Sequence, residues 1–106
     1  MKATRIIAGL VLSAVLVTSV GAMTGNQLKE VCSAEDLSWN NGFCSGFIMG
    51  AADAFPASDR ICIPEGVTYE QVRDVVRKYL GDHPEKLQKL AHGLVEEAIR
   101  KAFSCS

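Results

Sequence analysis

All four cysteines of this chain follow an N-terminal segment that has the features of a secretory leader. They are Cys32, Cys44, Cys62 and Cys105. Export delivers a protein to an oxidising compartment, where disulfides form and persist. Two disulfides are therefore the expected state of the mature protein. A domain this small buries only a modest core, so disulfides worth about 2–4 kcal/mol each would supply much of its net stability.

The leader has the three regions of a signal peptidase substrate. Lys2 and Arg5 form a positive start, residues 6–17 are almost wholly apolar, and small residues lead up to Ala22. The apolar run is shorter than the ~20 residues that a membrane-spanning helix needs, which makes an uncleaved anchor the weaker alternative. We expect a signal peptide over residues 1–22, a periplasmic domain over 23–106, and no membrane insertion after cleavage.

The charge of the mature domain gives a weaker indication. Without Lys2 and Arg5, nine basic residues face twelve acidic ones, a formal net charge of about -3. Proteins that bind nucleic acid usually carry basic patches, so we expect no nucleic-acid partner. A mild negative charge suits a basic protein partner and is also ordinary for a soluble domain.

A hydrophobic period of 3.6 residues dominates the mature chain and predicts an all-α fold, a small bundle of about four helices stapled by two disulfides. Residues 33–41, with Leu37 and Trp39 as apolar anchors, and residues 56–67 are expected to be loops. The predicted helices are Gly25–Cys32, Gly42–Phe55, a third from the cap Thr68 to Leu80, and a long fourth helix Pro84–Phe103.

Several local signals mark the ends of these helices. Thr24 with Gln27 and Thr68 with Gln71 have the spacing of capping boxes. Pro84 is suited to the first position of the fourth helix, and Gly81 to the position just after the third.

Three glycines repeat every four residues along the second predicted helix, at Gly42, Gly46 and Gly50. They form a bare stripe on one side of that helix. Glycine in a helix costs about 0.5–1 kcal/mol relative to alanine, so the stripe suggests that another backbone packs closely against it. A dimer contact and an internal contact both remain open, and we favour the internal core.

Four cysteines allow three pairings, and sequence alone cannot choose among them. Their placement on apolar faces favours Cys32–Cys44 and Cys62–Cys105. The first disulfide would join the first two helices across the polar loop. The second would attach the segment Ile61-Cys62-Ile63-Pro64, which must be extended before its proline, to the end of the last helix.

We expect neither catalysis nor a cofactor. The cysteines lack Cys-x-x-Cys spacing, which disfavours zinc and thiol redox chemistry. The two histidines, His83 and His92, do not share a face. His92 with Glu96 is a possible half of a metal site, but the pair is better explained as part of a solvated stripe, so no metal is expected. No serine or carboxylate lies in a recognisable nucleophile setting.

The order of short motifs along the mature chain resembles one known family. The motifs are Cys44-Ser45-Gly46-Phe47-Ile48-Met49-Gly50 with Ala51-Ala52-Asp53-Ala54, Ile61-Cys62-Ile63-Pro64, Thr68 with Gln71, Val75-Val76-Arg77-Lys78-Tyr79-Leu80, His83-Pro84-Glu85, and Ala102-Phe103-Ser104-Cys105. Their combination, with its spacing, resembles the Rap/Tai immunity proteins of type VI secretion systems over essentially the whole mature chain. One departure is Ser104, where that family often has proline.

The resemblance implies a periplasmic helical protein that binds and blocks a secreted peptidoglycan amidase effector, and it implies that a homodimer is possible. An inhibitor of this kind needs a rigid scaffold that presents a loop. The candidate contacts are the loop with Asp59 and Arg60 and the turn with Asp82 and His83, although both could be solvated connectors. The alternative functions are a small periplasmic stress chaperone and an envelope protein without a toxin partner.

Overall fold

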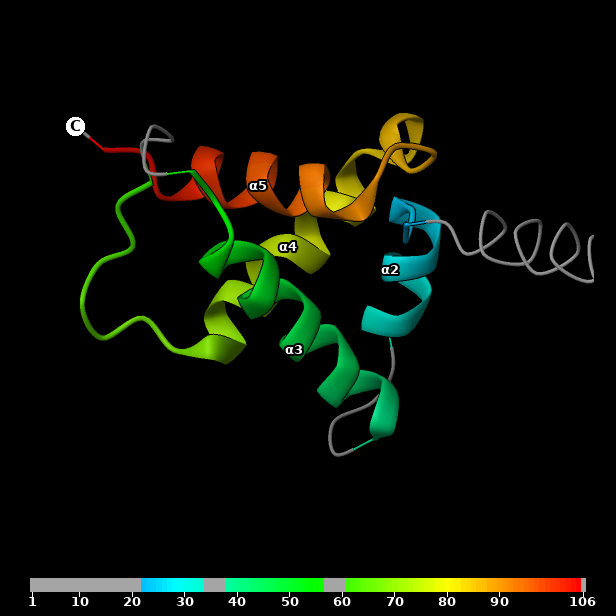
Figure 1. Ribbon diagram of the computed structural model, residues 1–106, viewed down its shortest axis with the longest axis horizontal. Helices are drawn as coiled ribbons and strands as arrows, with labels where there is room; N and C mark the ends of the chain where they lie inside the picture. Colours follow the sequence, from blue (N-terminus) through cyan, green and yellow to red (C-terminus); the bar gives the residue numbers. More distant parts are fainter. Residues whose placement is uncertain (1–21, 34–37, 57–60, 106) are drawn as a thin grey trace, which may run out of the picture.

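The computed structural model describes residues 22–33, 38–56 and 61–105 (Figure 1). These ranges contain four α-helices, one short 3-10 helix and no strand, which confirms the predicted all-α class. The predicted signal peptide lies outside them except for Ala22. None of the described helices combines the length and apolarity needed to cross a bilayer. The elements are α2 Gly25–Cys32, α3 Trp39–Asp53, α4 Tyr69–Asp82, η1 Pro84–Lys86 and α5 Ala91–Ala102.

Helix α5 contacts all three other α-helices and supplies the largest share of the core (Figure 1). Its apolar residues recur at helical spacing, so one face is fully covered while Arg100 and Lys101 remain outside. Burial of such a stripe is the main source of helix stability in a protein. The buried residues of α5 are Ala91, Leu94, Val95, Ala98 and Ile99, and those of the other elements are Leu28, Cys32, Cys44, Ile48, Val72, Val76, Leu80 and Leu87.

Both favoured disulfides are present. Cys32–Cys44 joins α2 to α3 with the Cα atoms 5.0 Å apart, and both side chains are buried in the core. Cys62–Cys105 joins the segment before α4 to the C-terminal residues, with a Cα separation of 5.1 Å. Next to it, the backbone N–H of Cys62 donates to the carbonyl of Phe103 at 2.7 Å. One disulfide therefore fixes α2 against α3, and the other fixes the segment before α4 against the residues that follow α5.

The predicted capping boxes are confirmed at the starts of α2 and α4. In each box the threonine side chain accepts from the glutamine N–H, and the glutamine side chain accepts from the threonine N–H. The start of α3 was predicted too late. It begins at Trp39 because Ser38 acts as its N-cap, accepting from the N–H of Asn41 at 3.0 Å.

The prediction that Gly81 terminates the third helix was wrong. Helix α4 continues to Asp82, and His83 is the residue that caps it. The Nδ1 atom of His83 lies 2.8 Å from the carbonyl oxygen of Tyr79, so the imidazole ring satisfies one of the last free carbonyls of the helix. A glycine with positive φ is therefore not needed there. Among the described residues such a glycine occurs at Gly66, with φ 93°.

The prediction of one long helix over 84–103 was also wrong. A 3-10 turn at Pro84–Lys86 is followed by a break, and α5 begins only at Ala91. Leu90, whose spacing fits the apolar face of a continuous helix, is instead extended and 48% exposed. Residues 23–26 form hydrogen bonds with the backbone groups at the break. The N–H groups of Gly25 and Asn26 donate to the carbonyls of Lys89 and Leu87, and the N–H of Ala91 donates to the carbonyl of Met23, each at 2.8 Å.

This crossing explains Gly25, which is buried against the break. A Cβ atom added to it would lie 2.5 Å from Leu94 Cδ1 and 2.9 Å from the carbonyl oxygen of Leu87. Only glycine allows the start of α2 to approach the backbone so closely.

The close packing predicted along the glycine stripe of α3 is absent. Gly42, Gly46 and Gly50 are exposed, and a Cβ added at any of them would meet nothing within 4 Å. The side of α3 that enters the core is instead the one with Cys44 and Ile48. The stripe faces outward in the monomer, so the interpretation as an internal contact was wrong.

Two alanine substitutions distinguish these glycines. Gly25→Ala should lower the free energy of unfolding by about 1–3 kcal/mol, because the added methyl overpacks a backbone crossing. Gly46→Ala should raise it by up to about 1 kcal/mol, because it restricts the unfolded chain and adds no clash. Urea unfolding of the oxidised variants measures both values. Equal effects of the two substitutions would contradict the assignment of Gly25 as the close-contact glycine.

Candidate partner-binding surface

The structure directs attention to contact surfaces rather than to reactive centres. All four cysteines are in disulfides, and the described residues include no group of three His, Cys, Asp or Glu side chains placed to hold a metal ion. His92 is exposed on α5. Its predicted neighbour Glu96 accepts from Arg100 at 3.4 Å.

The corner between α4 and η1 brings together two of the predicted contact residues. The His83 ring stacks on Tyr79 with centroids 4.1 Å apart, and it also caps α4 through Nδ1. Asp82 is exposed and accepts from Lys78 Nζ at 2.6 Å, and this hydrogen bond lowers the pKa of the Asp82 carboxyl. A pocket of about 240 Å³ lies beside them and reaches Ala98, Lys101 and Ala102 on α5.

A small polar network holds this corner against α5. The Tyr79 hydroxyl donates to Glu97 Oε2 at 2.6 Å, and Lys86 Nζ lies 3.1 Å from the same hydroxyl and 3.4 Å from Glu97. The hydrogen bond from Tyr79, supported by Lys86, lowers the pKa of Glu97. Burial and the Glu97 carboxylate raise the pKa of Tyr79. The network joins α4, η1 and α5, which makes the corner a fixed surface.

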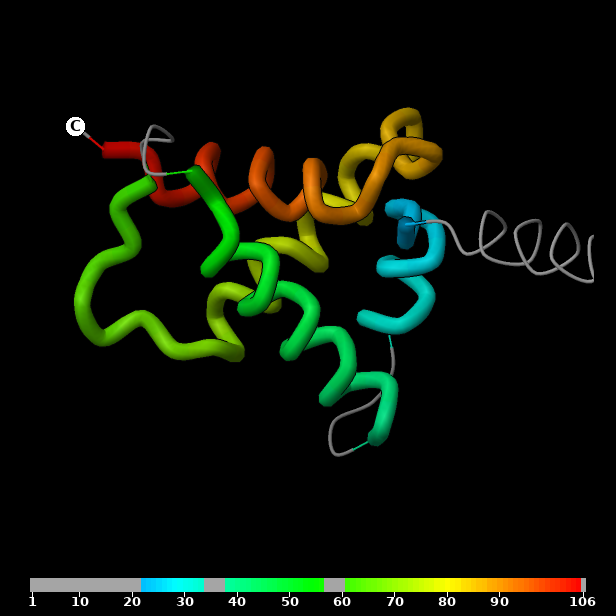
Figure 2. The backbone as a smooth tube through the Cα atoms, viewed as in Figure 1, coloured from blue at the N-terminus to red at the C-terminus, as the bar shows by residue number. Residues whose placement is uncertain are grey.

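The segment before α4 is the second candidate. Asp59 and Arg60, the predicted contact residues of this loop, lie outside the described residues. The following segment 61–67 extends from the helical body (Figure 2). Ile61 is partly buried against the core, but Ile63 is 38% exposed and residues 64–66 are exposed. The Cys62–Cys105 disulfide fixes the base of this segment to the end of α5.

An exposed face of α3 is the third candidate, and sequence reasoning missed it. Trp39 was predicted to anchor a loop, but its side chain is 84% exposed on the first turn of α3, and Phe43 one turn later is 43% exposed. With the bare glycines they make an apolar outer surface. The signal was present in the sequence, because this helix is apolar on nearly all sides and only one side can enter the core.

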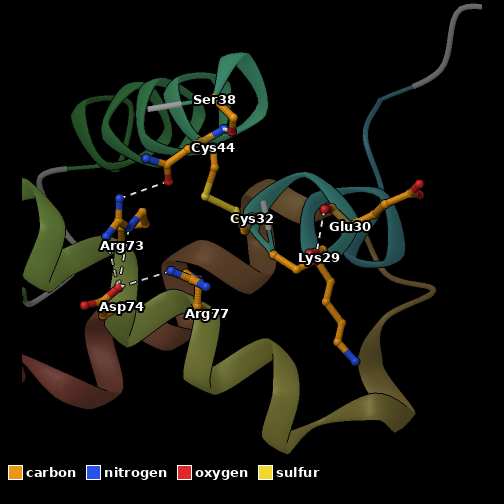
Figure 3. Close-up of a disulfide and its surroundings, with 10 residues drawn as sticks. Lys29, Glu30, Cys32, Ser38, Cys44, Arg73, Asp74 and Arg77 are labelled. Carbon is orange, nitrogen blue, oxygen red and sulfur yellow. Dashed lines mark hydrogen bonds and ion pairs between the residues drawn. A yellow bond between two sulfur atoms is a disulfide. The ribbon is translucent and has the colours of Figure 1, made fainter. Parts of the chain in front are cut away.

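The arrangement of α3 and α4 is fixed by one buried cation. Arg73 is 8% exposed, donates from Nη1 to Asn41 Oδ1 at 2.9 Å, and forms an ion pair with Asp74 at 3.4 Å (Figure 3). Hydrogen bonding of this kind is required when a charge is buried. The Arg73–Asn41 hydrogen bond holds the first turn of α3, where Trp39 is exposed, against α4.

Comparison with models of protein families places the chain in a known group. The family model of the Rap1a immunity proteins matches residues 24–105. The matched region runs from the N-cap of α2 to the last cysteine and so includes every described helix, both disulfides and all three candidate surfaces. No curated protein matches the chain.

The polar corner predicts a pH dependence of stability. Because the pKa of Glu97 is lower in the folded protein than its usual value of 4.5, its stabilising effect is fully present above that value. The effect is lost as the pH falls through the lowered folded pKa. Glu97→Gln should therefore be less stable than the parent at pH 7, and the difference should vanish in acid. Thermal melts of both proteins from pH 7 to pH 3 test this, and a constant difference would contradict it.

Proposed function

Because this chain belongs to the Rap1a immunity protein family, we propose that it binds and inhibits a type VI peptidoglycan amidase effector in the periplasm. The family match over residues 24–105 carries the proposal, since family membership implies immunity against a secreted effector. The target class and the compartment follow from the sequence resemblance and the leader. Inhibition would protect the producing cell and its kin from the effector.

Two disulfides support the choice of compartment. They join cysteines whose Cα atoms are 5.0 and 5.1 Å apart, and no cysteine is left free. Disulfides persist in the periplasm and are rare in the cytosol. They also support the mode of action, because a preorganised surface loses less conformational entropy when it binds.

We assign the amidase contact to the loop that contains Asp59 and Arg60 together with its continuation over residues 61–67, and to the corner with Asp82 and His83. The loop is held at its base by Cys62–Cys105 and presents the exposed Ile63. The corner is held by the stacking of His83 on Tyr79. Ile63 and Asp82 are therefore exposed on segments that the disulfide and the end of α4 hold in place.

We assign a homodimer contact to the outer face of α3. Trp39 and Phe43 offer exposed aromatic area there, and the glycines allow another helix backbone to approach closely. Aromatic side chains are enriched in interface cores. This surface contains neither of the two regions assigned to the amidase, so both contacts can form together.

Capture of an effector tests the proposed function directly. The mature, oxidised protein is used as bait in periplasmic extracts of cells with and without type VI effectors. We expect a peptidoglycan amidase to be recovered only from the first extract and its hydrolysis of peptidoglycan to stop at one inhibitor per enzyme. A folded, disulfide-intact bait that captures no hydrolase, or that leaves the captured hydrolase active, would refute the proposal.

Charge substitutions in the assigned contact refine the test. Asp59→Lys and Arg60→Glu should each weaken inhibition roughly tenfold or more, the effect of losing a charge-assisted hydrogen bond at an interface. Lys89→Glu is a matched control, because Lys89 is exposed and lies outside both assigned regions. Unchanged inhibition by the loop variants would move the contact to another surface and leave the proposed function standing.

The dimer assignment has a separate measurement. Sedimentation of the mature protein at increasing concentration should show a monomer–dimer equilibrium, and Phe43→Glu should shift it to monomer by placing a charge in an apolar contact. His92→Ala, on the exposed side of α5, is the control. A protein that stays monomeric at all concentrations would remove this assignment.

A further inference from the structure

A pocket of about 320 Å³ lies between the C-terminal end of α2 and the C-terminal half of α4, next to the buried Cys32–Cys44 disulfide. Figure 3 shows Lys29 on α2 and Arg77 on α4 beside this disulfide. The pocket lies outside the loop and the corner assigned above. It is lined by Lys29, Cys32, Ser33, Arg77, Lys78 and Leu80.

Three of the six lining residues are cations, and they come from two different helices. Arg77 has an acidic neighbour in Asp74 at 3.7 Å, and Lys78 in Asp82 at 2.6 Å. Both acids are on α4 itself, and neither of them lines the pocket. Lys29 forms no ion pair within the described part of the chain. The pocket therefore has cationic residues from both helices in its lining, and no acidic residue lines it.

The rest of the lining is apolar or already hydrogen-bonded. Cys32 and Leu80 are each 1% exposed and form an apolar floor. The Ser33 hydroxyl lies 2.8 Å from the carbonyl oxygen of Lys29 and 3.0 Å from that of Glu30, and it donates to these carbonyls. The charged donors in the lining are therefore Lys29, which has no ion pair within the described residues, and Arg77 and Lys78, whose acidic partners do not line the pocket. A carboxylate on a short methylene stem matches this lining, with the stem on the floor and the oxygens at the rim.

We propose that this pocket binds the carboxylate of a glutamate side chain on the protein partner. The guanidinium group of Arg77 can bind a carboxylate through two parallel hydrogen bonds, and Lys29 and Lys78 add point charges. The full chain has a net charge of -1, so this pocket is a local region of opposite sign that would orient an acidic partner surface. The identity of the partner as the effector rests on the proposed function, but the carboxylate site does not.

The first test uses a polyglutamate peptide as the probe and needs no effector. Fluorescence anisotropy of the labelled peptide should show weak, salt-sensitive binding to the mature oxidised protein, with NMR shifts at Lys29, Arg77 and Lys78. Lys29→Glu should reduce this binding roughly tenfold or more, the effect expected when a charge-assisted contact is lost. The matched control, Lys89→Glu, makes the same change in net charge. Lys89 lies in the segment before α5 and does not line the pocket, so this substitution should have little effect on peptide binding.

Three outcomes would overturn the proposal. Equal losses in Lys29→Glu and Lys89→Glu would show a general charge effect and no site. Binding of inorganic phosphate at these residues without binding of the peptide would indicate a small-anion site. Peptide binding that appears only in the variant Glu35→Gln/Asp36→Asn would show that the chain's own acidic residues occupy the pocket.

The second test separates this proposal from the proposed function. If the captured amidase is inhibited equally well by the parent and by Lys29→Glu, the immunity function stands and the carboxylate site is not part of the interface. If no amidase is captured, the peptide experiment still decides whether the site exists. A tenfold loss of inhibition in Lys29→Glu, with inhibition by Lys89→Glu unchanged, would support both proposals.

Discussion

The hydrogen bonds between the start of α2, with Met23 before it, and the segment that leads into α5 determine how the rest of the chain packs. Donors from Gly25 and Asn26 and the carbonyl of Met23 satisfy backbone groups over residues 87–91 that would otherwise continue a helix. Unpaired backbone groups in a buried region are costly, so each segment depends on the other. The crossing sets α2 against Leu94 of α5, and the Cys32–Cys44 disulfide then sets α3 against α2.

The features that could be predicted from the sequence are those with a local physical cause. Thr24 and Thr68 cap their helices through residues three positions away, and Cys32 and Cys44 lie on the buried faces of α2 and α3 that the helical period defines. The break before α5 could not be predicted in this way. The pattern from Leu87 to Phe103 fits a helix throughout, and its interruption depends on the chain near Gly25, distant in sequence. The packing of the glycine stripe was predicted wrongly for a related reason. Periodicity shows that one face of a helix lacks side chains, but not whether another element packs against that face.

The candidate contact residues were predictable only in part. Asp82 and His83 do lie together at a turn, but the sequence did not show that His83 would cap α4 and stack on Tyr79. The exposed aromatic face of α3 was not predicted, because Trp39 was expected to be an apolar anchor in a loop. The basic pocket was not predictable at all. Its cations are ordinary surface residues of two helices, and only the packing of α2 on α4 brings them together.

The stability of α3 suggests why a protein of this size keeps two disulfides. Only Cys44 and Ile48 of its residues are fully buried, and its three exposed glycines cost about 0.5–1 kcal/mol each relative to alanine. A disulfide that closes a loop of this length contributes about 3 kcal/mol, comparable to the summed cost of the glycines. The crosslink therefore allows α3 to keep an outer surface that does little for folding. Alanine at these three positions would make α3 more stable. The exposed glycines are therefore better explained by a requirement for contact with another protein surface than by a requirement for stability.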